Sequence, residues 1–166
     1  MDIIAVDPGA TESGWVIVNV RTRRILAFGK LPNEVLHANL ARLPRPTTHM
    51  AIEMIASYGM AVGATVFETC VWIGRFIDAF TQLDTNREDL YTRLTRAQVK
   101  VALCKQTKGV NDSVIRQRLI DLWGAPGTKK NPGPTYGIKS DAWAALGVAT
   151  AWMIQYKAPG TETWRL

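Results

Sequence analysis

The sequence contains few cysteines and few histidines, which narrows the chemistry available to it. Its 166 residues include only two of each. Cys70 and Cys104 lack the paired spacing of a zinc knuckle and are too few for a disulfide scaffold, so we expect a protein of the reducing cytosol. No Ser-His-Asp or Cys-His order is evident, and the isolated His37 and His49 are assigned no chemistry.

Long apolar segments are also missing. The longest run, residues 142–154, is too short for a helix that must cross roughly 30 Å of hydrocarbon. The N-terminal MDIIAVDPG has neither the basic flank nor the sustained apolar stretch of a secretory signal. We therefore expect a soluble protein.

What the sequence does have is the composition of an ordinary globular domain. Hydrophobic residues make up 47% of the chain and charged residues 20%, with 13 glycines and 8 prolines. This composition excludes a disordered, collagen-like or coiled-coil chain. A chain of this length buries roughly 70% of its unfolded surface around one core, so we expect a single domain over residues 1–166.

The net charge of +6 is concentrated in one part of the chain. Residues 84–140 hold eleven Lys or Arg against five Asp or Glu, whereas the flanking segments are balanced. Such a concentration is typical of a phosphate-binding surface, although a charged stretch is also the ordinary solvated face of many proteins. Tyr58 would stack on an unpaired base or pack on its own scaffold. The basic candidates for phosphate contact are Lys105, Lys108, Arg116, Arg118, Lys129, Lys130 and Lys139.

Strand-like and helix-like segments follow one another in an order that indicates an α/β fold. Short apolar runs predict strands over residues 3–6, 14–20, 25–30, 49–52 and 89–94. Helical periodicity predicts helices over residues 33–43, 61–80, 97–103, 112–123 and 141–156, with an irregular loop over 124–137. Ser140 is the expected cap of the last helix, and Asn111 or Asp112 the cap of the one before it. Three hairpin-connected strands followed by alternating strands and helices predict one mixed sheet covered by helices.

Three acidic residues lie at the ends of apolar segments, at positions where a solvent-exposed acid is not required. Asp7 ends the first strand, Glu53 ends the fourth, and Asp141 begins the last helix on its inward-facing side. Each has an ordinary explanation as a turn residue, a solvent-exposed strand end or a helix cap. If the three meet, their like charges require cations, and such oxygen ligands suit Mg²⁺ or Mn²⁺. Two ions about 4 Å apart would support phosphoryl transfer, which makes these acids candidate catalytic residues and metal ligands.

Four segments of the chain form an ordered set. They are AVDPGATESGW after the first strand, AIEMIASYGM at the fourth strand, KGVNDSVIRQRLIDLWG, and KSDAWAALGVATAW at the last helix. The set spans residues 3 to about 153 and resembles the RuvC-type Holliday junction resolvases, especially their phage and prophage branch. The DPG triplet alone is a weak signal, whereas the ordered set is specific.

The resemblance implies a ribonuclease H-like fold with a mixed five-stranded sheet, three antiparallel strands and then parallel strands, flanked by helices. It implies a homodimer that nicks paired strands of a four-way DNA junction with Mg²⁺, leaving 5′-phosphate and 3′-hydroxyl ends. Such enzymes act in DNA recombination and repair, here in the cytoplasm of a bacterium or a phage-infected host cell. By position, the metal-binding acids of the family correspond to Asp7, Glu53 and Asp141.

The sequence departs from the family pattern at two positions. Family members carry a further acid one turn into the last helix, where this chain has Ala144. The stacking aromatic after the fourth strand is replaced by Ala56, with Tyr58 two residues later. The alternative to a nuclease is therefore a junction-binding protein with weak or lost cleavage. An actin-like or sugar-kinase ATPase also begins with an apolar strand, an acid and glycine, but 166 residues leave no room for its two domains.

Overall fold

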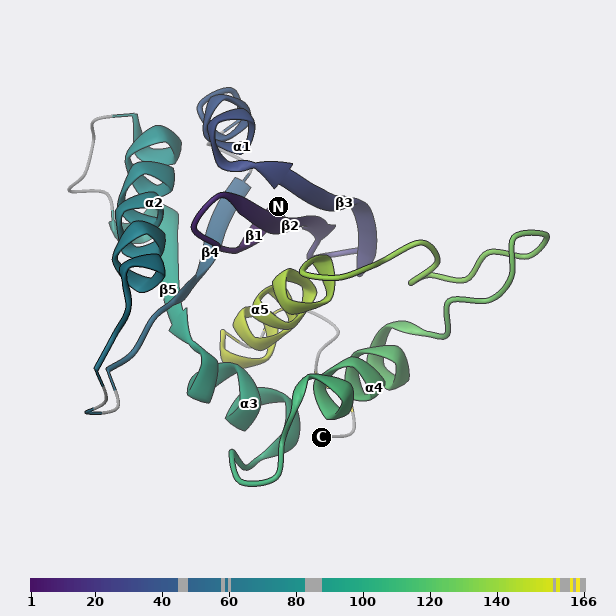
Figure 1. Ribbon diagram of the computed structural model, residues 1–166. Coiled ribbons are helices and arrows are strands. Elements are labelled where there is room, and N and C mark those ends of the chain that lie inside the picture. The colour runs from purple at the N-terminus through teal and green to yellow at the C-terminus, as the bar shows by residue number, and fades with distance from the viewer. Residues whose placement is uncertain are drawn as a thin grey trace.

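Five strands form one mixed sheet in the order β3-β2-β1-β4-β5 (Figure 1). The computed structural model describes residues 1–44, 48–57, 59, 61–82, 88–156, 158, 162 and 164. β1, β2 and β3 are antiparallel neighbours, whereas β4 runs parallel to β1 and β5 parallel to β4. The predicted mixed sheet is therefore confirmed. The strands are β1 (Asp2–Asp7), β2 (Glu12–Asn19), β3 (Arg24–Pro32), β4 (Thr48–Met54) and β5 (Tyr91–Thr95).

Helices cover both faces of the sheet (Figure 1). One face carries α1 (Asn33–Leu40) and α2 (Ala64–Thr81). The other carries α3 (Arg96–Cys104), α4 (Asp112–Trp123) and α5 (Ala142–Gln155), and a short 3₁₀ helix, η2 (Glu88–Leu90), leads into β5. None of the described helices is both long and apolar enough to cross a membrane. The helices begin and end within three residues of their predicted bounds.

The core has two layers because side chains of a strand alternate between the faces of the sheet. On β1, Ile3 and Ala5 belong to the layer under α5, whereas Ile4 and Val6 belong to the layer under α1 and α2. α5 is buried along nearly its whole length and contacts β1, β2 and β4. A residue at the start of α5 is thereby fixed relative to the end of β1.

The buried face of α2 agrees only in part with the predicted one, because Ile73 and Phe80 are buried as expected whereas Val62 and Cys70 are exposed. Helical spacing predicts one face on the sheet, formed by Val62, Val66, Cys70, Ile73, Ile77 and Phe80. In the structure Cys70 is exposed, whereas Trp72 and Phe76 are buried. Burial of the Trp72 and Phe76 rings stabilises this orientation of the helix. As a result, Phe67 and Val71 are 61% and 56% exposed.

Candidate functional site

Asp7, Glu53 and Asp141 line one cavity at the carboxyl ends of β1 and β4. Val6 and Ile52 lie opposite each other in the parallel β1–β4 pair, so the residues that follow them are neighbours. Asp141 immediately precedes α5. The cavity that all three line has a volume of about 500 Å³. The carboxyl ends of strands are also where open α/β sheets bind ligands, so this cavity is the candidate site.

Gly14 on β2 allows Asp141 to approach the sheet. It lies opposite Asp7 in the β1–β2 pair. A Cβ atom on residue 14 would lie 2.7 Å from the Cβ of Asp141 and even closer to its carbonyl group. Because real Cβ atoms essentially never come this near, any side chain here would push the start of α5 away from β1. Gly14 therefore sets the spacing of the two acids.

A buried hydrogen-bond network fixes the turn that follows Asp7. The Oγ of Ser13 accepts a hydrogen bond from the Gly9 amide at 3.2 Å and donates one to Oδ1 of Asn33 at 2.7 Å. Nδ2 of Asn33 donates to the Gly9 carbonyl at 2.9 Å. Both polar side chains are buried and paired, so the network holds the turn in one conformation. The sequence pattern identifies neither of them.

Asp7 carries the strongest electrostatic perturbation of the site. Its carboxyl group has no hydrogen bond or ion pair within the described part of the chain. Burial, and then the charges of Glu53 and Asp141, raise the pKa of Asp7 from 3.8 to about 7. The nearby guanidinium of Arg96 opposes this rise in pKa. The ionised form of Asp7 thus lacks a partner, and a cation in the cavity would stabilise it.

Two basic side chains pair with the other two acids. Nη1 of Arg96 lies 3.3 Å from Oε2 of Glu53. Nζ of Lys30 lies 3.0 Å from Oδ2 of Asp141 and 3.3 Å from Oε2 of Glu12. Burial raises the pKa of Glu53, and the charge of Arg96 acts against it. Among the residues that the structure describes, no three acidic, His or Cys side chains are already spaced as metal ligands.

The donor set nevertheless suits a hard divalent cation. The acidic side chains that line the cavity offer only oxygen ligands, and neither His nor Cys lines it. Ala144 also lines the cavity and contributes no ligand where the family has a further acid. Mg²⁺ keeps several waters and takes one or two carboxylates, so three acids are enough to hold it. Binding would require Glu53 and Asp141 to exchange their basic partners for the ion.

Asp112 and Arg96 line the cavity although neither was predicted as a site residue. Of the two predicted caps of α4 the structure has Asn111, whose side chain accepts the Val114 amide at 3.0 Å, and not Asp112. The Asp112 carboxylate instead pairs with Arg96. Arg96 is the first residue of α3, directly after β5. Its position at the carboxyl end of the strand next to β4 is the signal that would have identified it.

Ser140 does not cap α5 as predicted. Its φ is 46°, and its Oγ donates to Oδ1 of Asp141 at 3.1 Å. Asp141 occupies the N-cap position of α5 but makes no side-chain capping hydrogen bond. Its carboxylate is therefore directed to Lys30 and the cavity, which excludes helix capping as the explanation for this acid.

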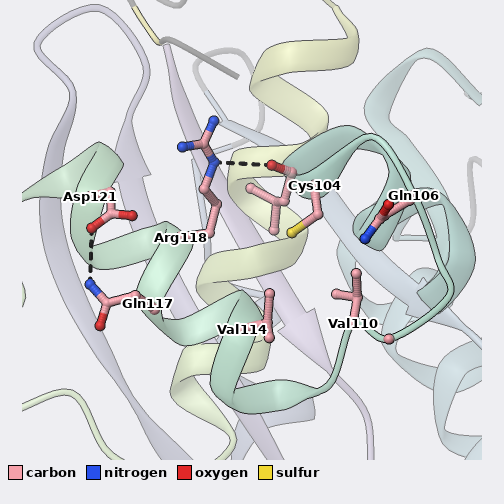
Figure 2. A pocket seen from close by; sticks show the side chains of 9 residues that line it. Cys104, Gln106, Val110, Val114, Gln117, Arg118 and Asp121 are labelled. Atoms are coloured by element: carbon pink, nitrogen blue, oxygen red, sulfur yellow. Dashed lines mark hydrogen bonds between the residues drawn. The ribbon is translucent and has the colours of Figure 1, made fainter.

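The two arginines of α4 lie in different cavities. Arg116 lines the acidic cavity, with its guanidinium carbon 5.0 Å from the centre of the Trp143 ring. Arg118 lines a second cavity of about 500 Å³ between α3 and α4 (Figure 2). Its Nε donates to the Leu103 carbonyl at 3.1 Å, a bond that ties α4 to the end of α3 (Figure 2). Arg116 is thus placed beside the acids, whereas Arg118 is engaged in holding two helices together.

The predicted lysines are exposed on the connections of the chain. Lys105 and Lys108 lie between α3 and α4, and Lys139 lies near Asp141. Tyr58 is outside the described residues.

The segment between α4 and α5 forms an arm that protrudes from the body of the protein (Figure 1). Lys129 and Lys130 are exposed on it. Gly127 and Pro132 form an isolated antiparallel bridge, and the Gly133 amide donates to the Pro126 carbonyl at 2.8 Å. The predicted irregular loop therefore contains a small hairpin, and neither lysine is among the residues that line the cavity with Asp7, Glu53 and Asp141.

The chain resembles solved structures although its sequence matches no protein-family model and no curated protein. RuvC from Thermus thermophilus is similar over 95% of this chain and 96% of that chain, with a TM-score of 0.69 and 17% identity. T. thermophilus RuvC in complex with Holliday junction substrate is similar over 95% of both chains, with a TM-score of 0.67 and 17% identity. The predicted RuvC-like fold is therefore confirmed over nearly the whole chain, and the phage branch stays a prediction.

Proposed function

We propose that this chain is a metal-dependent, structure-selective DNA endonuclease that resolves four-way junctions by paired nicks. The observation that carries the proposal is the cavity in which Asp7, Glu53 and Asp141 meet, because these are the acids that the resemblance assigns to metal binding. The fold is that of RuvC, and one similar RuvC structure contains a Holliday junction substrate. Fold and site therefore favour the same activity.

The roles of the residues follow from their positions. Asp7, Glu53 and Asp141 would hold Mg²⁺, or Mn²⁺, as two ions. When bound, such ions would stabilise the attacking and leaving oxygens of an in-line displacement at a phosphodiester. The resemblance to RuvC-type resolvases implies 5′-phosphate and 3′-hydroxyl products. Arg116, at the edge of the cavity, would orient a DNA phosphate, since guanidinium groups match phosphate geometry. The exposed lysines would bind the phosphate backbones of the junction arms.

Paired nicks need two sites, so the proposal includes a homodimer with two-fold symmetry. The outer face of α2 supports it. Phe67 and Val71 are 61% and 56% exposed on this helix, and Cys70 beside them is also exposed. Apolar side chains at helical spacing on a surface are typical of an interface with another protein. A second copy of this chain is the partner that two symmetric cuts require.

A junction-binding protein with weak or lost cleavage is the second candidate. Two observations favour it: Ala144 supplies no ligand, and Arg96 and Lys30 already pair with two of the three acids. Such a protein would bind four-way junctions tightly and nick them in neither Mg²⁺ nor Mn²⁺.

A gel assay distinguishes the two functions. End-labelled four-way junction and linear duplex of the same sequence are incubated with the protein, with and without Mg²⁺ or Mn²⁺. The nuclease is expected to nick the junction symmetrically and only with metal, and the nicked products should be sealed by DNA ligase. Equal cleavage of the linear duplex would contradict resolvase function, and binding without nicking would favour the second candidate.

Two variants connect the result to the cavity. Asp7→Asn is expected to bind the junction with unchanged affinity and to lose nicking. Asp121→Asn is the matched control, because Asp121 is an exposed acid of α4 that lies outside the acidic cavity and bonds Gln117 at 2.9 Å. If both variants lose nicking equally, the cavity is not the site of cleavage.

A further inference from the structure

The acidic cavity contains a cationic side chain whose backbone is fixed independently of the acids. Arg96 follows β5, which pairs with β4 so that Thr95 lies opposite Met54, next to Glu53. Thr95 caps α3: its Oγ1 accepts the Gln98 amide at 3.3 Å, and the Gln98 side chain accepts the Thr95 amide at 2.7 Å. These two residues thus fix the start of α3, and the Arg96 side chain takes no part in the capping and lines the cavity.

Two carboxylates from different elements share the Arg96 guanidinium. Nη1 lies 3.3 Å from Oε2 of Glu53, and Nη2 pairs with Oδ1 of Asp112. The two acids differ in environment, because the side chain of Glu53 is 17% exposed and that of Asp112 is 89% exposed. One half of this bridge therefore lies inside the cavity and the other at its rim in solvent.

Asp112 lies in the first turn of α4, where an acid complements the helix dipole, but its carboxylate makes no capping hydrogen bond there. Asn111 already caps α4, so capping does not require the Asp112 side chain. Its carboxylate makes its ion pair across to α3 instead. The guanidinium of Arg96 is therefore shared between Glu53 in the cavity and the exposed Asp112.

We infer that Arg96 is a positioning residue for Glu53, that it competes with a divalent cation for this carboxylate, and that Asp112 weakens this competition by holding the guanidinium at the rim of the cavity. The inference rests on the proposed function, because it takes the cavity as the metal site. It also accounts for the absence, among the described residues, of three acids spaced as metal ligands, since Glu53 is held by Arg96.

Mn²⁺ binding to the metal-free protein tests the inference without cleavage. The free ion is measured by electron paramagnetic resonance, and Asp7→Asn shows how much binding belongs to the cavity. Arg96→Gln is expected to bind Mn²⁺ about tenfold more tightly, a change that corresponds to about 1.4 kcal/mol. Asp112→Asn is expected to bind it about threefold to tenfold more weakly, because Arg96 then pairs with Glu53 alone.

The double variant shows whether Asp112 acts through Arg96. In an Arg96→Gln background, Asp112→Asn is expected to change Mn²⁺ affinity by less than about twofold, because the guanidinium that it positions is gone. A charge control is Arg93→Gln, which removes an exposed arginine of β5 outside the acidic cavity and is expected to leave the affinity unchanged.

A merely structural role would move both single variants in the same direction, since each breaks part of one bridge. Weaker Mn²⁺ binding by Arg96→Gln, or an undiminished effect of Asp112→Asn in the double variant, would overturn the inference. If Arg96→Gln fails to fold, Asp112→Asn still tests it, because its exposed side chain can be changed without disturbing the core. Junction nicking, assayed in parallel, separates the two proposals: opposite shifts in Mn²⁺ affinity without nicking support the inference and contradict the nuclease.

Discussion

Replacing Gly14 with alanine tests whether the site depends on the close approach of α5 to β2. The added Cβ would lie 2.7 Å from the Cβ of Asp141, whereas ordinary van der Waals contact begins at 3.4 Å. The start of α5 must therefore move by roughly 1 Å, and a displacement of that size costs about 100-fold in rate. Overpacking of this kind also lowers the free energy of unfolding by about 1–3 kcal/mol.

The assay is single-turnover nicking of a four-way junction at saturating protein and Mg²⁺, with thermal unfolding as the measure of stability. Gly63→Ala is the matched control, because its Cβ would meet nothing within 4 Å and its φ of -85° suits alanine. We expect Gly14→Ala to bind the junction normally, since the exposed lysines are unchanged, and to nick it about 100-fold more slowly. A wild-type rate for Gly14→Ala would refute the assignment of Asp141 to the reacting site.

Three further predictions concern pH, assembly and DNA binding. Because the pKa of Asp7 rises from 3.8 to about 7 on folding, the folded metal-free protein holds an extra proton between these values, so its unfolding free energy should fall as pH rises across this range. Thermal melts of Asp7→Asn should lack this fall, and wild-type nicking at subsaturating Mg²⁺ should rise with pH and level off above about pH 7. Phe67→Glu should convert the proposed dimer to a monomer in size-exclusion chromatography with light scattering, and a wild-type dimer with unchanged mass in the variant would exclude α2 as the interface. Replacing Lys129 and Lys130 with Gln should reduce the slope of log affinity against log salt by about 1.8, and an unchanged slope would place the arm outside the DNA contact.

Local sequence was sufficient to predict the elements and the three acids. The pattern that predicts Asp7 is an apolar strand ending before Pro-Gly, and the pattern that predicts Glu53 is a second apolar strand. Both patterns involve only a few neighbouring residues. The same information predicts three hairpin-connected strands in a mixed sheet, whereas the places of β4 and β5 beside β1 are seen in the structure. Asp141 was identifiable because it directly precedes an apolar helix, and the structure buries that helix along nearly its whole length.

Contacts between distant segments were not predictable in this way. The rotation of α2 depends on which aromatic side chains the sheet accommodates, so Cys70 is exposed despite its place in the periodic pattern. The role of Gly14 as a spacer depends on the contact between α5 and β2. The pairing of Asp112 with Arg96 likewise depends on the contact between α4 and α3.

Periodicity and turn chemistry act over a few residues, so the amino-acid sequence indicates which elements form and which acids lie at their ends. The basic groups that face those acids depend on tertiary packing. Arg96 lies 43 positions from Glu53 and 16 from Asp112 along the chain. Pairing over such distances is set by the packing of β4, β5 and α4 in three dimensions, and no local pattern encodes it.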